Sequence, residues 1–131
     1  MASGSEFVSG VDFVGIPTRH LQATAAFYGE TLGLPRSVYV EERHYAEFEA
    51  GNLTLSLYNA EQMGLGHNIN RNPIALHVDD VAATRKQLES RGVSFHGDTI
   101  DTGVCHMAVF DDPEGNALML HHRYAPRRTD G

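Results

Sequence analysis

The sequence has little of three things: cysteine, long apolar runs and positive charge. A single cysteine, Cys105, excludes an intramolecular disulfide and suits a reducing compartment. No apolar run approaches the roughly 20 residues that a membrane-spanning helix needs, and no charged segment followed by an apolar one marks a secretory signal. A net charge of −7 argues against a nucleic-acid partner, because phosphate contacts need a basic surface. We therefore expect a cytoplasmic protein that binds neither membrane nor nucleic acid.

The composition is that of an ordinary globular domain. Hydrophobic residues make up 41% and charged residues 21% of the 131 residues, which is enough chain to bury a core. The first seven residues read MASGSEF, and Gly-Ser-Glu-Phe is what two adjacent cloning sites often encode. We interpret residues 1–7 as vector-derived and expect a single domain over 8–131.

An internal repeat divides this domain into two halves. Each half carries the pattern His-x-Ala-x-Phe, a Gly-Asn turn and an apolar strand, first from His44 and again from His106. The upstream elements follow the same order, which makes a chance match of five residues a poor explanation. The halves are module one at about 10–58 and module two at about 73–122, joined by a glycine- and asparagine-rich linker over 59–72.

Hydrophobic periodicity predicts one helix and four strands in each module. Gly33 and Gly92 follow the two apolar helical patterns and are placed to end the helices. Each module therefore reads βαβββ. The expected helices are 21–32 and 81–91, and the expected strands are 11–17, 37–41, 44–50, 53–58, 74–78, a ragged strand from 94–95, 105–110 and 117–121.

Three motifs in order resemble the vicinal-oxygen-chelate family, which includes glyoxalases, bleomycin-resistance proteins and dioxygenases. They are Ala26-Phe27-Tyr28 followed by Leu32-Gly33-Leu34, then Val78-Asp79-Asp80-Val81, and Asp112-Pro113-Glu114-Gly115-Asn116. The resemblance runs from about Val11 to His122. It implies an α+β fold of two tandem βαβββ modules, forming a curved eight-stranded cup with the helices outside. It also implies a homodimer, since many members pair modules between chains.

The ligands of the family's metal enzymes are absent at the corresponding positions. The first-strand histidine falls on Phe13 in module one and on Pro73 in module two, and the final-strand glutamate falls on Met119. In module one the same glutamate position falls on Leu55 or, if the alignment of the last strand slips by one residue, on Thr54. We prefer the slip, because it sends the leucines under the helix and Thr54 and Ser56 into the cup. These side chains do not suit a divalent metal, so we predict no cofactor at this site.

Strand alternation selects the residues that should line the cup. The apolar face belongs beneath the helix, so Leu76, Leu118 and Leu120 are expected there, with Ala46 and Phe48 in module one. The opposite face is expected to bind the ligand, with Phe13, Tyr45, Glu47, His77, Met119 and His121.

Two readings of function follow. In the first, a metal-free, bleomycin-resistance-like protein binds or sequesters a hydrophobic or aromatic small molecule, with sparse polar anchors in an apolar cup. In the second, a glyoxalase- or dioxygenase-type enzyme uses a divalent metal displaced to His77, His121 and Glu47, or metal-free acid–base chemistry by His77 with Glu47. The sequence leaves open whether the protein is an enzyme, and whether one chain or two close the cup.

Overall fold

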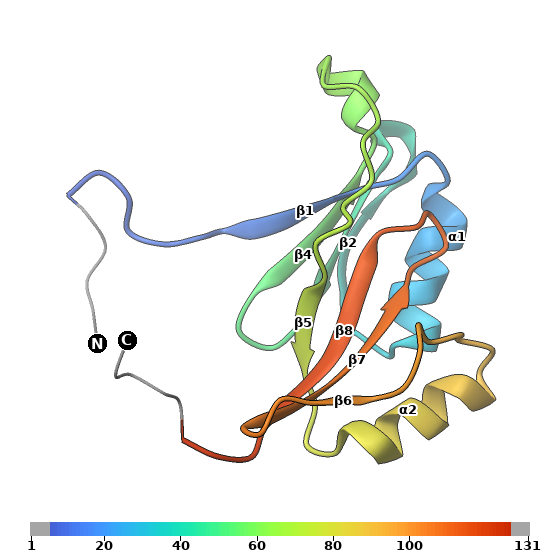
Figure 1. The fold of residues 1–131 in the computed structure, drawn as a ribbon. Coiled ribbons are helices and arrows are strands. Elements are labelled where there is room, and N and C mark those ends of the chain that lie inside the picture. Colours follow the sequence, from blue (N-terminus) through green and yellow to red (C-terminus); the bar gives the residue numbers. More distant parts are fainter. Residues whose placement is uncertain (1–5, 127–131) are drawn as a thin grey trace.

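The structure, a computed structural model, describes residues 6–126 and consists of two βαβββ modules (Figure 1). The remaining residues, 1–5 of the segment we interpret as vector-derived and 127–131 of the expected domain, lie outside the described part. Module one comprises β1 (Phe13–Pro17), α1 (Leu21–Ala26), a π-helical segment η1 (Phe27–Thr31), β2 (Arg36–Val40), η2 (Glu41–Arg43), β3 (Tyr45–Glu49) and β4 (Thr54–Tyr58). Module two comprises β5 (Ile74–His77), α2 (Val81–Ser90), β6 (Ile100–Asp101), β7 (Cys105–Asp111) and β8 (Ala117–Arg123). The linker between them contains one 3₁₀ turn, η3 (Ala60–Met63).

The two sheets repeat one topology. Sheet one has the order β1-β4-β3-β2 and sheet two the order β5-β8-β7-β6, with the first and last strand of each module parallel. The predicted two-module α+β fold is confirmed. The eight strands do not form one continuous sheet, however, because the described residues contain no strand pair between β1 and β5. Each module is a separate open sheet of four strands.

Two local predictions differ from the structure. The first helix is α-helical only to Ala26 and continues as a π-helical turn, in which the Leu32 N–H donates to the Phe27 carbonyl. The ragged strand of module two forms at Ile100–Asp101, whereas Phe95 makes only an isolated bridge to Phe110. Gly97 lies between the two at φ 69°, a left-handed conformation that interrupts a strand. Both predicted glycine stops, Gly33 and Gly92, do have positive φ.

The faces of the sheets follow the predicted alternation. Ala46, Phe48, Leu118 and Leu120 are at most 2% exposed, and Leu76 is partly buried next to them. Full burial of a leucine or phenylalanine side chain contributes roughly 1.5–3 kcal/mol, so the alternation fixes the register of both modules. The slip in β4 is also confirmed, since Leu55 and Leu57 are buried under α1 while Thr54 and Ser56 lie on the other face with Glu49 and Glu47.

One hydrophobic core joins the modules on their helix-covered faces. Buried residues of both sheets form a single cluster, and the ring of Phe27 in η1 lies 6.3 Å from the ring of Phe110 in β7. Residues 6–12 run away from both sheets (Figure 1). No helix within 6–126 has both the length and the apolar composition needed to cross a membrane.

Candidate ligand-binding site

The uncovered face of module one carries a hollow of about 320 Å³. Phe13 of β1, Tyr45 and Glu47 of β3, and Ser56 and Tyr58 of β4 contribute to its lining, together with Arg43 and linker residues as far as Met63. Phe13 is 52% exposed, an unusual state for a large aromatic side chain that faces a concave surface. The hollow contains three of the predicted ligand-binding residues: Phe13, Tyr45 and Glu47.

The absence of a side chain at Gly15 leaves room for the ring of Tyr58, which lines this hollow. A Cβ atom at Gly15 would lie 2.6 Å from Cε1 of Tyr58, closer than side chains pack. The absence of a side chain on the central residue of β1 therefore allows the Tyr58 ring to lie across the strand. Sequence analysis did not select Tyr58 or Gly15. Strand alternation could have identified both residues. Tyr58 lies two residues after Ser56 in β4, and Gly15 lies two residues after Phe13 in β1, so each projects from the same face as that residue.

The uncovered face of module two carries the other three predicted residues. His77 pairs with His121 and Ala75 with Met119 along the parallel strands β5 and β8, so each pair projects from the same side of the sheet. Met107 and Val109 of β7 lie beside them, opposite His121 and Met119. Unlike the hollow of module one, this face combines histidines with flexible apolar side chains.

The pKa of His121 is held below its ordinary value. Partial burial is the main cause, followed by the positive charges of Arg123, His77 and His122 nearby. His77 is more accessible, with its side chain 72% exposed and its Nε2 3.5 Å from Oδ1 of Asp79. A neutral imidazole at His121 offers both a hydrogen-bond donor and an acceptor to a ligand at neutral pH.

Within one chain the two sets of residues do not share a cavity. The hollow that contains Glu47 is lined entirely by residues 13–63, whereas His77 and His121 belong to sheet two. The proposed acid–base pair of His77 with Glu47 is therefore not formed inside a single chain. Each uncovered face lies on the side of its sheet opposite the common core.

The donor atoms at the family's metal positions do not suit a divalent metal. Phe13 begins β1, Met119 lies in β8 and Pro73 precedes β5, so an aromatic ring, a thioether and a pyrrolidine occupy these places. Within residues 6–126 no three His, Cys, Asp or Glu side chains come close enough together to hold a metal ion. The alternative ligand set His77, His121 and Glu47 is likewise not assembled in one chain.

The turn between β7 and β8 fixes the relative position of the two modules. Asp112 is 4% exposed and accepts hydrogen bonds from the Tyr28 hydroxyl of η1 at 2.8 Å and from the Asn116 amide at 2.9 Å. Asn116 also donates to the Pro17 carbonyl and accepts from the Asn70 N–H, both at 2.9 Å. Burial, followed by the charge and hydrogen bond of Asp112, raises the pKa of Tyr28 far above its ordinary value, so this hydroxyl remains a donor.

Glu114 in the same turn connects the linker to the first module. Its side chain is 7% exposed, and its carboxylate lies 3.0 Å from Nδ1 of His20 and 3.3 Å from Nε2 of His67. The Arg19 N–H donates to it at 2.7 Å. Burial on its own would raise the pKa of Glu114, but the His20 and Arg19 hydrogen bonds and the two imidazoles lower it below its ordinary value. The sequence motif marked this turn without showing that its polar residues hold the modules together.

The structure is thus a two-module α+β protein with an open hollow on the uncovered face of module one. The model of the Glyoxalase/Bleomycin resistance protein/Dioxygenase superfamily matches residues 10–120. The chain therefore belongs to this superfamily, and the predicted resemblance is confirmed. No curated protein matches the chain at a significant level.

Solved structures of the same superfamily show the same fold. A superfamily member from Sphaerobacter thermophilus superposes with a TM-score of 0.76 at 20% identity, covering 88% of this chain and 98% of its own. A lactoylglutathione lyase from Agrobacterium tumefaciens gives 0.75 at 16% identity, covering 87% and 93%. The antibiotic-binding protein TnmS3 from a Streptomyces species gives 0.76 at 25% identity, covering 88% and 97%.

Proposed function

We propose that this protein is a metal-free binding protein, similar to bleomycin-resistance proteins, that binds or sequesters a hydrophobic or aromatic small molecule. The observation that carries the proposal is the hollow of about 320 Å³ with Phe13, Tyr45 and Tyr58 on its walls and Glu47 as its carboxylate. Aromatic walls with a few polar groups are what small-molecule sites present. The similarity to an antibiotic-binding protein supports an antibiotic as the kind of ligand and a role in antibiotic resistance.

A homodimer would complete the site. We propose that the uncovered face of module one in one chain meets the uncovered face of module two in a second chain, so that Phe13, Tyr45 and Glu47 face His77, Met119 and His121. This arrangement would enclose the exposed ring of Phe13 and supply the second wall that the hollow lacks. Free Cys105 suits the reducing cytoplasm that we expect for it.

An enzyme is the second candidate, favoured by His121. Its lowered pKa keeps the imidazole neutral near pH 7, as a general base requires. Dimerisation would be needed to bring His77 or His121 to Glu47, either as an acid–base pair or as ligands of a displaced metal. Metal analysis separates the metal-free binding protein from the metal-dependent form of the enzyme. We expect each chain to retain less than 0.1 equivalent of zinc, nickel, iron or manganese with a Kd of about 1 µM or tighter. One equivalent of metal that is lost in His77→Ala would instead favour the enzyme.

Calorimetric titration with bleomycin and with a planar anthraquinone tests the binding function directly. We expect at least one to bind, and Tyr45→Ala to weaken its Kd by about tenfold, or 1.4 kcal/mol. Ser37→Ala, at an exposed position of β2 outside the hollow, is the control and should leave the Kd unchanged. Binding that is equally strong in Tyr45→Ala would move the ligand away from this hollow.

A further inference from the structure

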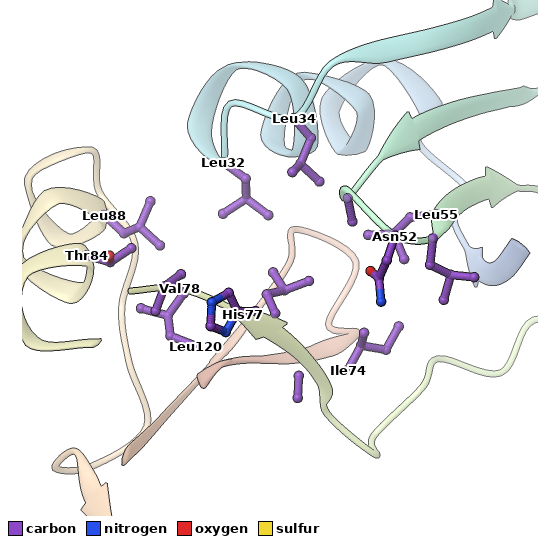
Figure 2. A pocket seen from close by; sticks show the side chains of 14 residues that line it. Leu32, Leu34, Asn52, Leu55, Ile74, His77, Val78, Thr84, Leu88 and Leu120 are labelled. Atoms are coloured by element: carbon purple, nitrogen blue, oxygen red, sulfur yellow. The ribbon is translucent and has the colours of Figure 1, made fainter. Parts of the chain in front are cut away.

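A second cavity lies between the modules on their helix-covered side. It has a volume of about 320 Å³ and lies away from the hollow that contains Phe13 and Tyr45, with which it shares no lining residue. Figure 2 shows its walls: Leu32 and Leu34 point in from the end of η1, Thr84 and Leu88 from α2, and Asn52 and Leu55 from the β3–β4 hairpin and β4. Strand β5 closes it from below. Neither the family resemblance nor strand alternation predicted this cavity.

Its lining is apolar and uncharged. Besides Asn52, His77 and Thr84 the lining consists of aliphatic residues, namely Leu32, Leu34, Ala50, Leu53, Leu55, Ile74, Ala75, Leu76, Val78, Leu88 and Leu120. No Asp, Glu, Lys or Arg contributes to it. A charged ligand would be partly desolvated here, and the lining offers it no Asp, Glu, Lys or Arg as a partner. The lining therefore selects an uncharged apolar molecule.

Two polar groups are free to bind the polar end of such a molecule. Neither the Asn52 amide nor the Thr84 hydroxyl has a hydrogen-bond partner among the residues that the structure describes. They lie on opposite sides of the cavity in Figure 2, one on the hairpin of module one and one on α2 of module two. The volume of the cavity lies at the lower end of the usual range for ligand sites. Its mostly apolar lining with a few unpaired polar groups is typical of a small-molecule pocket.

Elements of both modules form the walls of the cavity. Leu55, Leu88 and Leu120 are buried at its base, whereas Leu32, Leu34, Leu53, Ile74, Leu76 and Val78 remain partly exposed toward it. We propose that this inter-module cavity binds a small uncharged aromatic or alicyclic molecule, with Asn52 or Thr84 bound to its polar group. The cavity shares no lining residue with the hollow of module one, and it shares His77 with the dimeric site proposed above.

Binding of N-phenyl-1-naphthylamine, an uncharged probe that fluoresces in apolar surroundings, tests the proposal. The background is Tyr45→Ala, which removes an aromatic wall of the other hollow. We expect saturable fluorescence with one site per chain, and a Kd at least tenfold weaker in Tyr45→Ala/Thr84→Phe, because the new ring fills the cavity. Ala82→Phe adds the same ring on the exposed face of α2 and should leave the Kd unchanged. Circular dichroism establishes that each variant is folded.

Competition by three related compounds defines the ligand class. Naphthalene and 1-naphthol should displace the probe, 1-naphthol more effectively, and 1-naphthoate should fail because it is charged. Asn52→Ala or Thr84→Val should reduce the advantage of 1-naphthol over naphthalene by several-fold. The Asn52→Ala change lies on an exposed hairpin and should not disturb the fold.

Three results would overturn the proposal. The first is a probe signal that disappears in Tyr45→Ala but persists in Thr84→Phe, which would place the probe in the hollow of module one. The second is equal displacement by 1-naphthoate and naphthalene. The third is probe binding that decreases as protein concentration rises, which would show that a second copy of the chain covers the cavity. The function proposed for the hollow of module one is tested separately, by the calorimetric titration.

Discussion

The two modules repeat one fold, yet equivalent residues of the repeat have different surroundings. Asn52 and Asn116 both follow the turn glycine before the last strand. Asn116 is 1% exposed and bridges three segments of the chain, whereas Asn52 is exposed on a hairpin beside the inter-module cavity. The same position thus fixes the structure in one module and is available to a ligand in the other. Duplication preserved the topology while the contacts diverged.

The uncovered faces differ in the same way. Module one offers aromatic rings and Glu47, and module two offers His77, His121 and Met119. Neither face alone combines aromatic walls with imidazole donors. The two faces are therefore not equivalent, and this difference supports the proposed site shared between two chains. Three changes would break or sharpen this comparison.

The largest effect is expected from the paired asparagines. Asn116→Ala removes bonds to Pro17 and Asp112 and leaves the Asn70 N–H without its acceptor, so we expect the free energy of unfolding to fall by about 2–4 kcal/mol. Asn52→Ala should change it by less than about 0.5 kcal/mol. Urea denaturation measures both. Equal losses in the two variants would show that the repeat positions are equivalent after all.

An intermediate effect is expected from dividing the site between two chains. Tyr45→Ala and His121→Ala should each weaken binding of the ligand found by calorimetry by about tenfold. In a mixed dimer with one variant in each chain, one of the two exchanged cups contains neither substitution. Half of the sites should therefore recover the original Kd. If each cup is formed within one chain, every site carries a substitution and no site recovers.

The smallest effect concerns pH, where His121 and Glu114 act in the same direction but over different pH ranges. The pKa of His121 is lower in the folded than in the unfolded chain, so protonation favours unfolding, and stability should rise with pH up to about 6.5. The pKa of Glu114 is also lower in the folded chain, so its contribution is present above about 4.5 and is lost as pH falls further. His121→Gln should flatten the stability curve just below neutrality, and Glu114→Gln only in the acid range. Urea midpoints measured from about pH 4 to 8 distinguish them, and identical curves for His121→Gln and the unaltered protein would contradict the assignment.

Sequence analysis was most accurate where burial alone decides the structure. Alternation placed Phe48, Leu118 and Leu120 correctly, and periodicity with its glycine stops located both helices. It was least accurate at the ragged strand of module two. The run after Gly92 contains Gly97 and Gly103, and its few pairings depend on β7 rather than on its own pattern. The ligand-binding roles of the six selected residues are still predictions.

The sequence by itself determined the two βαβββ modules and their register, because both depend on periodicity along a few neighbouring positions. It also determined that Phe13, Pro73 and Met119 are not metal-binding side chains, because this depends on residue type alone. Only the tertiary structure decided how the modules meet. The buried network of Tyr28, Asp112 and Asn116 joins segments more than 80 residues apart, since Tyr28 and Asp112 are separated by 84 positions. No local pattern specifies such a contact. The same docking leaves the two uncovered faces apart and opens the apolar cavity beside β5. Where the two sheets face each other depends on side chains that are distant in sequence and adjacent only after folding.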